Sequence, residues 1–491
     1  MTAAPTGGGD SALLGRRARD LARRPVVSCG PDVPVSEASR LMSRQGVGSV
    51  VVTDAGAPVG IVTDRDLRNR VLAAGLPETT TVRTIMSAPL RVVAASSLGL
   101  EALLEMTRHG IHHLGVVEDG RLLGMISSHD FLSLQSVHPV GLARDIERVT
   151  RLDELTQSAS RMVDVIRGLA DSGAGAVEIG RVVAELNDRI VRRLLALVEE
   201  SLAVGSGQRP PAPYSWLAAG SEGRREQTLK TDQDNGLVYA DPDPGDAAPC
   251  EAYFGRLGAA AAEGLSRLGY PPCPGGFMAS NPRWCRPLSA WRAEVDSWLE
   301  AADPQRLLFA SVFCDMRPVA GDERPGLTLW QSICERAPHS PLFLRFMALS
   351  ALERAPALDL LGRLAVPRRG PHRGTLDLKA SALLPVSQAM RVYALSLGIP
   401  ETNTMDRLRA SEERGALPAV ESRDVREAYA VVARLRLRHQ LDSLAAGRAP
   451  DNRIDPGTLA RTDRALLKEA FKAIAWLQRL LEDRFQTNLV S

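Results

Sequence analysis

The feature that most constrains this chain of 491 residues is an internal repeat near its N-terminus. The segment MSRQGVGSVVVTDAGAPVGIVTDRDL (42–67) aligns with MTRHGIHHLGVVEDGRLLGMISSHDF (106–131) without a change of offset. Each copy has the pattern of an amphipathic helix ending near a glycine, an apolar strand, a turn with glycine and a second strand. A repeated unit of this size buries its apolar face against its neighbour, so we expect two β-α-β-β-α units in one domain.

The second strand of each copy carries a motif that resembles the CBS domain, a domain that occurs as tandem pairs. The motif reads GIVTDRD (60–66) in the first copy and GMISSHD (124–130) in the second. The resemblance implies a tandem CBS pair over residues 23–138, with copies at about 23–75 and 82–138. It also implies a homodimer formed through the CBS pair.

In CBS pairs the cleft between the copies often holds an adenine nucleotide, and the resemblance places such a regulatory ligand at Thr63, Asp66, Ser127 and Asp130. A carboxylate accepts paired hydrogen bonds from a ribose diol, and a hydroxyl with backbone N–H groups at a helix start suits a phosphate. The alternative is that Asp66 and Asp130 only cap the helices that follow them.

The rest of the chain reads as one α/β region among helices, so the fold class is a multidomain α/β and α protein. Apolar residues at helical spacing fill the segment before a proline-rich stretch, GSGQRPPAPYS (205–215), which marks a boundary. A strand is predicted at Leu307–Met316. The predicted segments are a mobile leader (1–22), a helical linker (139–205), an α/β domain (206–338) and a C-terminal helical domain (339–491).

Composition excludes several classes of function. Sixty basic against 58 acidic residues and 4% aromatics do not suggest a dedicated nucleic-acid binder. The six cysteines form no C-x-x-C pair, which is typical of a reducing compartment. No secretory signal and no run of about 18 uncharged apolar residues is present. We therefore expect a cytoplasmic protein that binds neither nucleic acid nor membrane.

The candidate catalytic and ligand-binding residues concentrate in the segment GSEGRREQTLKTDQDNGLVY (220–239). An apolar strand beginning at Trp216 runs into a Gly-Ser turn, and a short helix can follow. A glycine turn lets the backbone approach a phosphate closely, and nearby hydroxyl or guanidinium groups add hydrogen bonds or charge. The residues expected to bind phosphate are Gly220, Ser221, Gly223 and Arg224.

Two carboxylates precede the next predicted strand. Residues i and i+2 of a strand project to the same side, so Asp232 and Asp234 are expected to lie together. Like charges so close repel unless a cation lies between them, and Mg²⁺ commonly bridges carboxylates to substrate phosphates. The pair therefore predicts a site for Mg²⁺ or Mn²⁺. The alternative is a turn, capped by the aspartates, before a buried strand.

The combined pattern G-S-x(9 or 10)-D-x-D resembles the signature of the polymerase-β-like nucleotidyltransferase superfamily. The longer form, GSxGRxE followed by TDQDN, is similar to the catalytic motif of the bacterial PII-protein uridylyltransferases. With a CBS pair before it and helices after it, the chain resembles the CBS-domain nucleotidyltransferases of the DUF294 family over nearly its whole length. Further stretches that fit are GYPPCPGGFMASNPRW (269–284), FCDMRPVAGD (313–322), DLKASALLPVSQAMRVYAL (377–395), NTMDRL (403–408) and LRLRHQ (435–440).

The resemblance implies a third acidic residue on a later strand, and Asp315 in FCDMR is the candidate. One metal ion would then be held by Asp315 with Asp232 and Asp234, and a second by the latter two, as in the two-metal scheme. The alternative for Asp315 is an ion pair with Arg317.

The C-terminal helical domain is expected to be substrate-binding. Lys379 and Arg391 are candidates for contacts with the triphosphate or base, although such residues on helices are usually only solvated.

The implied reaction is uridylyl- or adenylyltransferase-like: a nucleoside monophosphate moves from a nucleoside triphosphate to a protein or small-molecule acceptor. The HD-type hydrolase motif of the PII enzymes is not found. The competing interpretation is a non-catalytic, CBS-based nucleotide sensor with an inactive transferase domain. Both aspartates of the D-x-D pair are intact, which favours the enzyme.

Overall fold

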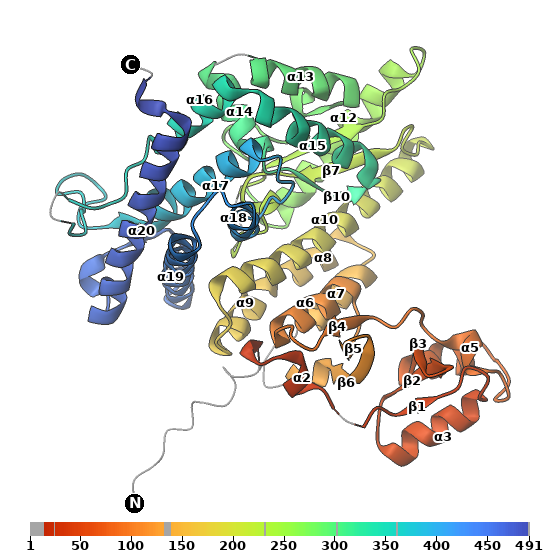
Figure 1. Cartoon of the computed structure of the whole chain (residues 1–491). Coiled ribbons are helices and arrows are strands. Elements are labelled where there is room, and N and C mark those ends of the chain that lie inside the picture. Colours follow the sequence, from red (N-terminus) through yellow and green to blue (C-terminus); the bar gives the residue numbers. More distant parts are fainter. Residues whose placement is uncertain are drawn as a thin grey trace, which may run out of the picture. The chain divides into compact units, whose positions relative to one another are not determined.

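The computed structural model describes residues 14–23, 25–131, 139–229, 232–300, 303–359 and 362–489. The chain divides into two compact units (Figure 1). The first comprises Met1–Asp145 with Gly168–Ala174, and the second comprises Ile146–Arg167 with Gly175–Ser491. Each described helix is too short or too polar to span a membrane.

The first unit contains two three-stranded sheets of the same topology, one from each copy of the repeat. In each sheet the first strand is parallel to the second, which is antiparallel to the third. The register also repeats: Ser49 pairs with Thr63, and His113 with Ser127. The elements are β1 (Ser28–Cys29), α3 (Val35–Gln45), β2 (Ser49–Asp54) and β3 (Ala57–Thr63), then β4 (Val92–Ala94), α6 (Gly99–His109), β5 (His113–Glu118) and β6 (Arg121–Ser127). The predicted tandem architecture is confirmed.

Each helix of the repeat ends where the sequence predicts. Gly46 after α3 and Gly110 after α6 adopt φ of 63° and 60°, left-handed values that a glycine reaches at little cost. Apolar residues of α3 such as Val35 and Met42 are buried in the core of their copy, beside strand residues such as Val62. The helical stripe and the apolar strands thus build the core of the first copy.

The sheet of the second unit has four strands in the order β10-β7-β8-β9. They are β7 (Tyr214–Ala218), β8 (Asn235–Tyr239), β9 (Cys285–Pro287) and β10 (Arg317–Gly321). All residues of β7 and β8 are buried. Helix α15 (Glu323–Arg336) packs on β7 and β10, and α10 (Ala176–Ser206) packs on β10 and on α12 (Ala247–Arg267).

The strand predicted at Leu307–Met316 is wrong. Residues Pro304–Phe313 form helix α14, preceded by Asp303, whose side chain accepts a hydrogen bond from the backbone N–H of Gln305 at 2.7 Å. An aspartate cap followed by proline is a strong helix start, and it outweighs the apolar run read as a strand. The chain enters β10 only after a turn at residues 314–316.

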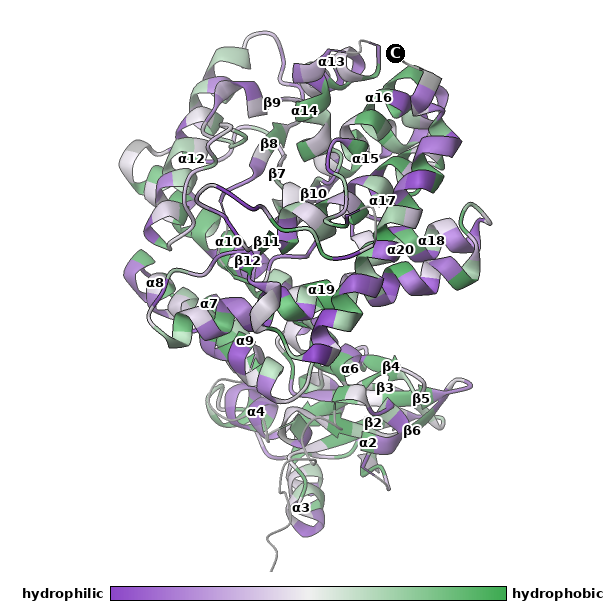
Figure 2. Ribbon diagram, turned by 90° about the vertical axis from the view of Figure 1, so that its left-hand side faces the viewer, coloured by the Kyte–Doolittle hydropathy of each residue, from purple (hydrophilic) through white to green (hydrophobic). Residues whose placement is uncertain are grey.

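The C-terminal region is helical, as predicted. Its main helices are α16 (Pro341–Leu352), α17 (Leu384–Ser396), α18 (Thr404–Glu413), α19 (Ala419–Ala445) and α20 (Arg461–Phe485). Hydrophilic and hydrophobic residues alternate along α19 and α20, as expected for helices with one buried face (Figure 2). One apolar core runs from Leu217 of the sheet through Phe313 to Leu477 of α20. The α/β region and the C-terminal helices therefore share a core.

Candidate active site

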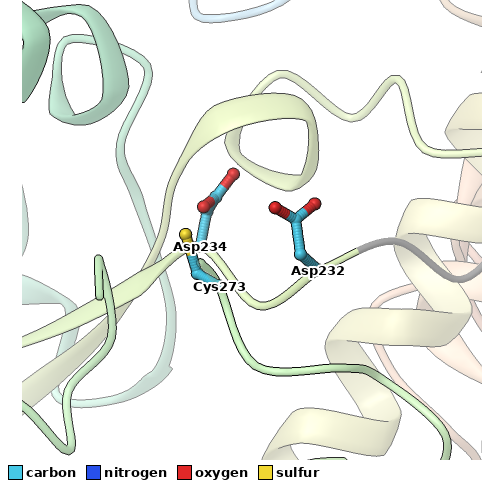
Figure 3. A group of neighbouring side chains, drawn as sticks. All are labelled: Asp232, Asp234 and Cys273. Atoms are coloured by element: carbon cyan, nitrogen blue, oxygen red, sulfur yellow. The ribbon is translucent and has the colours of Figure 1, made fainter. Parts of the chain in front are cut away.

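Asp232 and Asp234 lie on the segment that leads into β8, on either side of a buried glutamine. The Nε2 of Gln233 donates hydrogen bonds to Tyr270 O at 2.8 Å and Ser266 Oγ at 3.1 Å, which turns this side chain into the protein. Alternation then places both carboxylates on the opposite side, where they lie together (Figure 3). The geometry expected from the i, i+2 spacing is present.

The pKa of Asp234 shows that the charges of the two carboxylates oppose each other. Burial raises the pKa of Asp234, and the neighbouring Asp232 raises it further, to about 6. A hydrogen bond from Cys273 and the charge of Lys379 lower this pKa but do not cancel the rise. A divalent cation between the carboxylates would relieve this repulsion.

The first glycine of the motif is required by the pair. Gly220 has φ of 54°, and a Cβ there would lie 2.4 Å from Asp234 Oδ2. The backbone N–H of Ala219 donates to Asp234 O at 2.9 Å, which fixes the two segments together. Helix α11 (Gly220–Gly223) is a single turn. Gly220 and the partly exposed Ser221 thus lie beside the carboxylates, where phosphate contact by either residue remains a prediction.

Asp315 does not join the pair, which corrects the expected third carboxylate. It lies in the turn before β10 and is fully buried. Its Oδ2 accepts hydrogen bonds from Arg224 Nη1 at 2.6 Å and Arg391 Nη2 at 2.5 Å. Its Oδ1 accepts from Arg407 Nη1 at 2.6 Å and Arg391 Nε at 3.0 Å. Burial raises the pKa of Asp315, but the three guanidinium groups outweigh it and hold the pKa well below its usual range.

The ion pair expected as the alternative for Asp315 is also wrong. Arg317 binds Asp188 of α10 instead, with Nη1–Oδ2 at 2.6 Å and Nη2–Oδ1 at 2.7 Å. Both partners are buried, and a bidentate arginine–carboxylate pair is the geometry that best compensates such burial.

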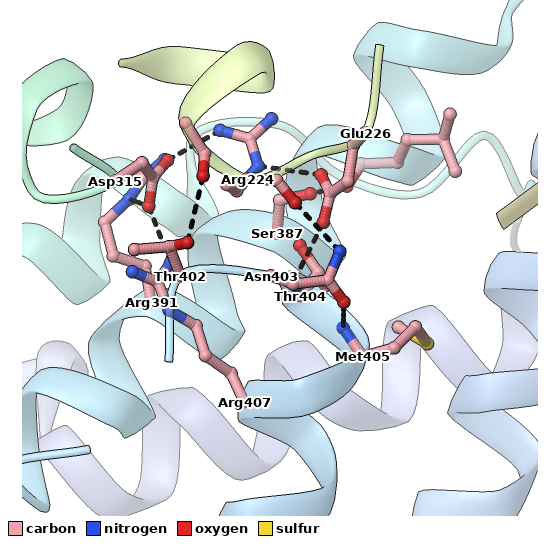
Figure 4. Close-up of polar contacts among 12 residues, drawn as sticks. Arg224, Glu226, Asp315, Ser387, Arg391, Thr402, Asn403, Thr404, Met405 and Arg407 are labelled. Atoms are coloured by element: carbon pink, nitrogen blue, oxygen red, sulfur yellow. Dashed lines mark hydrogen bonds and ion pairs between the residues drawn. The ribbon is translucent and has the colours of Figure 1, made fainter. Parts of the chain in front are cut away.

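Arg224 and Arg391, expected to bind phosphate, belong to the Asp315 cluster. Both are buried, and Arg224 bridges Asp315 and Glu226, donating from Nε to Glu226 Oε2 at 2.7 Å (Figure 4). Arg407, which the sequence analysis did not single out, completes the cluster and also donates to Cys314 O at 2.9 Å. A buried arginine on a helix leaves no periodic signal in the sequence, because its partners come from distant segments.

The GRRE part of the motif (223–226) is hydrogen-bonded to the segment that leads into α18. Glu226 Oε1 accepts from the backbone N–H of Thr404 at 2.8 Å. Asn403 Nδ2 donates to Arg224 O at 2.8 Å, and Thr402 Oγ1 donates to Gly223 O at 2.9 Å (Figure 4). A Cβ on Gly223 would lie 2.0 Å from Asp315 O, so this glycine allows the close approach of the two segments. This network joins the motif to the C-terminal helices, which gives NTMDRL a structural role.

Lys379, by contrast, remains near the pair. It begins the short helix Lys379–Leu383 and is partly exposed. Burial lowers the pKa of Lys379, and Arg436 lowers it further, whereas Asp232 and Asp234 act to raise it. The lysine therefore lies within electrostatic range of both carboxylates, where contact with a triphosphate remains a prediction.

Cys273 is the site residue that sequence reasoning missed. It lies in the loop that fits the family segment GYPPCPGGFMASNPRW, and one ligand atom from each of Asp232, Asp234 and Cys273 lies within 4.8 Å of the others (Figure 3). Cys273 has no partner cysteine at C-x-x-C spacing and lies far from the carboxylates in sequence, so no local pattern marks it as a ligand.

The first unit contains a cavity of about 920 Å³ with residues from both repeat copies in its lining. Thr63, Asp66 and Ser127 line it, and Asp130 is not in its lining. Two acidic residues, Asp64 and Asp66, face a larger set of arginines. These arginines are Arg23, Arg65, Arg68, Arg70, Arg91 and Arg144.

Asp66 and Asp130 each bind back to the hydroxyl residue three positions earlier; in the first copy Thr63 is the N-cap of the short helix Asp64–Asp66, and Asp66 is its third residue. Asp66 Oδ2 accepts from Thr63 N at 3.0 Å and Thr63 Oγ1 at 2.7 Å. Asp130 Oδ2 accepts in the same way from Ser127 N at 2.7 Å and Ser127 Oγ at 2.9 Å. The other oxygen of Asp130 accepts from Arg23 Nε at 2.7 Å. The four predicted ligand contacts stay predictions.

Protein-family models match segments in both compact units of the chain. The model described as "Putative nucleotidyltransferase DUF294" matches residues 160–305, and "Putative nucleotidyltransferase substrate binding domain" matches 341–485. The CBS domain matches residues 18–73 and 82–136. The chain belongs to the DUF294 family and carries a CBS pair. The tandem CBS pair and both DUF294 regions predicted from the sequence are thereby confirmed.

The curated relatives of this DUF294 protein match only part of it. An uncharacterized protein of Methanopyrus kandleri is 35% identical over 119 residues, which are 24% of this chain and 61% of that protein. The CBS domain-containing protein CBSCBSPB2 of Arabidopsis thaliana is 40% identical over 94 residues, 19% of this chain and 18% of that protein. The CBS domain-containing protein YhcV of Bacillus subtilis is 31% identical, over 23% of this chain and 80% of that protein. The chain thus spans less than two thirds of the first two relatives.

Solved structures of CBS proteins also resemble part of this DUF294 protein. A CBS-domain containing protein from Agrobacterium tumefaciens is 35% identical and covers 24% of this chain and 93% of that chain, with a TM-score of 0.23. A CBS domain protein from Pyrobaculum aerophilum, complexed with AMP, is 29% identical and covers 23% of this chain and 89% of that chain, with a TM-score of 0.22.

Proposed function

We propose that this protein transfers a nucleoside monophosphate from a nucleoside triphosphate to a protein or small-molecule acceptor, with divalent cations at Asp232 and Asp234. The observation that carries the proposal is the convergence of these two carboxylates beside Gly220, in a region matched by the DUF294 model. Two oxygen ligands with mutual repulsion fit Mg²⁺ or Mn²⁺. A bound cation would neutralise developing phosphate charge and orient the reacting oxygens.

The residues of the chain would act mainly by position. Asp232 and Asp234 hold the cations, Gly220 and Ser221 leave space for the phosphates, and Lys379 supplies positive charge from the C-terminal helices. The acceptor oxygen forms a bond to the α-phosphorus, the bond to the β-phosphate oxygen breaks, and the acceptor proton passes to solvent while pyrophosphate leaves. Holding reactants in line in this way accounts for large rate effects without a covalent intermediate.

The test is transfer of label from each α-labelled nucleoside triphosphate, with Mg²⁺ or Mn²⁺, to acceptors in a cell lysate. We expect transfer by the wild-type protein and a loss of at least ~100-fold in Asp232→Asn and Asp234→Asn, because each removes a charged ligand of the cations. Asp243→Asn, an exposed aspartate beyond β8, is the matched control. Equal transfer by the wild type and both site variants would contradict the proposal.

One observation favours a second candidate, a nucleotide sensor without turnover. Arg224 and Arg391 are bound to Asp315, so fewer cationic groups face a triphosphate than the sequence suggests. Such a protein would bind a nucleoside triphosphate at the pair without label transfer. Equilibrium binding of a non-hydrolysable triphosphate, measured beside the transfer assay, separates the two candidates.

We also propose that the cavity of the CBS pair binds an adenine nucleotide, which regulates transfer. The surplus of arginines over acidic residues in its lining supports an anionic ligand, and Thr63 and Ser127 offer hydroxyls. Coupling of about 1–3 kcal/mol between the ligand and the transferase is sufficient for control. The CBS pair would also mediate a homodimer, which light scattering of the full chain tests by its molecular mass.

Thermal unfolding with AMP, ATP and adenosine tests the regulatory ligand, because a ligand that binds only the folded state raises the melting temperature. We expect both nucleotides to raise it and Arg91→Ala to weaken the effect. Arg40→Ala, on α3 and outside this cavity, serves as control. A response to adenosine equal to that for ATP would show that phosphate recognition is absent.

A further inference from the structure

The third ligand-bearing side chain beside the carboxylate pair is a thiol. Among the described residues, Asp232, Asp234 and Cys273 form the one group of three histidine, cysteine or acidic side chains whose ligand atoms all lie within 4.8 Å of each other. Cys273 is 8% exposed, and its sulfur lies beside the Asp234 carboxylate (Figure 3). Asp315, which the family resemblance places here, is held elsewhere by three arginines.

The loop that carries Cys273 is fixed to the strand that carries the aspartates. The backbone N–H of Gln233 donates to Pro271 O at 3.0 Å, and that of Asn235 donates to Phe277 O at 2.9 Å. Asn235 Oδ1 in turn accepts from Ala279 N at 2.8 Å. These bonds flank the cysteine on both sides, so its sulfur has a defined position relative to the pair.

We infer that Cys273 is a direct ligand of the cation held by Asp232 and Asp234, which makes this a mixed oxygen and sulfur site. This inference rests on the proposed function. Thiolates favour softer divalent cations such as Zn²⁺ and Co²⁺, whereas Mg²⁺ takes hard oxygen ligands. The cysteine therefore gives the site a strong preference for transition metals, and a Zn²⁺ ion bound through sulfur competes with Mg²⁺ for the same carboxylates.

The geometry distinguishes Cys273 from the other buried cysteines. Cys250 on α12, for example, is also buried, at 1% exposed, but belongs to no such group of ligands among the residues described. The positive charge of Lys379 also acts on both aspartates. The site therefore combines two carboxylates, a thiol and a lysine ammonium group from three separate segments.

The test is titration of the full chain with Co²⁺, without nucleotide, followed by absorption spectroscopy. A cobalt ion bound through a thiolate gives a sulfur-to-metal charge-transfer band in the near ultraviolet. We expect this band in the wild type and in the control Cys250→Ser, and its loss in Cys273→Ser and Cys273→Ala. Far-ultraviolet circular dichroism and thermal unfolding show whether each variant is folded.

Competition with a chelator then gives affinities. We expect Cys273→Ser to bind Zn²⁺ and Co²⁺ at least ~10-fold more weakly, because loss of even an outer-sphere partner of a metal ligand costs that much, and Mg²⁺ with little change. Co²⁺ that binds through Asp232 and Asp234 without the band would overturn the thiol ligand and leave the proposed function standing. Failure of wild-type protein to bind any divalent cation at the pair, shown by identical binding in Asp232→Asn, would instead overturn the proposed function.

Discussion

The second unit places carboxylates of one expected metal site in two opposite environments. Asp232 and Asp234 lie together, partly exposed, and burial together with the charge of Asp232 raises the pKa of Asp234 to about 6. Asp315 is fully buried among Arg224, Arg391 and Arg407, which hold its pKa well below the usual range. In the first environment one carboxylate raises the pKa of the other, whereas in the second three guanidinium groups surround a single carboxylate. The same type of side chain thus lies beside a like charge in one place and within an ion-pair cluster in the other.

The largest expected effect concerns the buried aspartate. Asp315→Asn leaves three buried guanidinium groups with one carboxylate fewer, and removing one partner of a buried ion pair costs about 3–5 kcal/mol. We expect the free energy of unfolding, measured with denaturant, to fall by this amount. Asp232→Asn, the contrasting variant, should change it by less than ~0.5 kcal/mol or raise it.

If Asp315→Asn were as stable as the wild type but lost its affinity for Mn²⁺, the comparison would fail, because Asp315 would then behave as a metal ligand.

Gly223 and Gly220 of the motif lie against Asp315 and Asp234, respectively, so substituting them tests the two environments separately. A Cβ at Gly223 would meet the backbone oxygen of Asp315 at 2.0 Å, and one at Gly220 would meet the side chain of Asp234 at 2.4 Å. A backbone atom cannot turn away as a carboxylate can, so Gly223→Ala should cost about 3 kcal/mol, at the upper end for overpacking. Gly220→Ala should cost about 1–2 kcal/mol, from its positive φ.

Denaturant unfolding measures both costs, and Mn²⁺ binding supplies the second readout. Gly220→Ala should weaken binding because it displaces Asp234. Gly141→Ala, in a helix with open space around the glycine, is the control. A larger loss of stability in Gly220→Ala than in Gly223→Ala would contradict this account.

The pH dependence of cation binding tests the pair alone. Because the pKa of Asp234 is raised to about 6, a proton competes with the cation below that pH. Affinity for Mn²⁺ should therefore rise by up to ~10-fold per pH unit between about pH 5 and 6 and level off above.

Stability should move in the opposite direction. The carboxyl of Asp234 binds its proton more tightly in the folded state than in the unfolded one, where its pKa is about 3.9. The free energy of unfolding in the absence of metal should then fall as pH rises from about 4 to about 6. Asp234→Asn should remove this part of the slope, and an unchanged slope would show that another group is responsible.

The smallest effect concerns the contact between the motif and the C-terminal helices. Thr402→Ala removes the hydroxyl that donates to Gly223 O at 2.9 Å, and we expect a loss of about 1 kcal/mol. Thr458→Ala removes an exposed hydroxyl with a similar bond to Asp455 O and should cost less. Equal losses of unfolding free energy in the two variants would mean that the contact near the motif stabilises the protein no more than an exposed hydrogen bond does.

The sequence predicts the parts of the molecule that depend on local pattern. The repeat fixes the topology of the first unit, and alternation along the chain places Asp232 and Asp234 on one side. The surroundings of Asp315 do not follow from any local pattern, because its arginine partners lie 76, 91 and 92 positions away in the sequence. Cys273 comes to the pair in the same way, through a loop whose path depends on backbone bonds to β8.

The shared core of the second unit has a consequence for how this architecture is inherited. The two DUF294 regions, 160–305 and 341–485, are separate in sequence but bury their apolar residues in one interior. A protein cut between them would expose that interior on both pieces, so neither should persist as a free module. Gene fusion or recombination should therefore exchange the CBS pair more readily than either DUF294 region, and the two DUF294 regions should pass together between genomes.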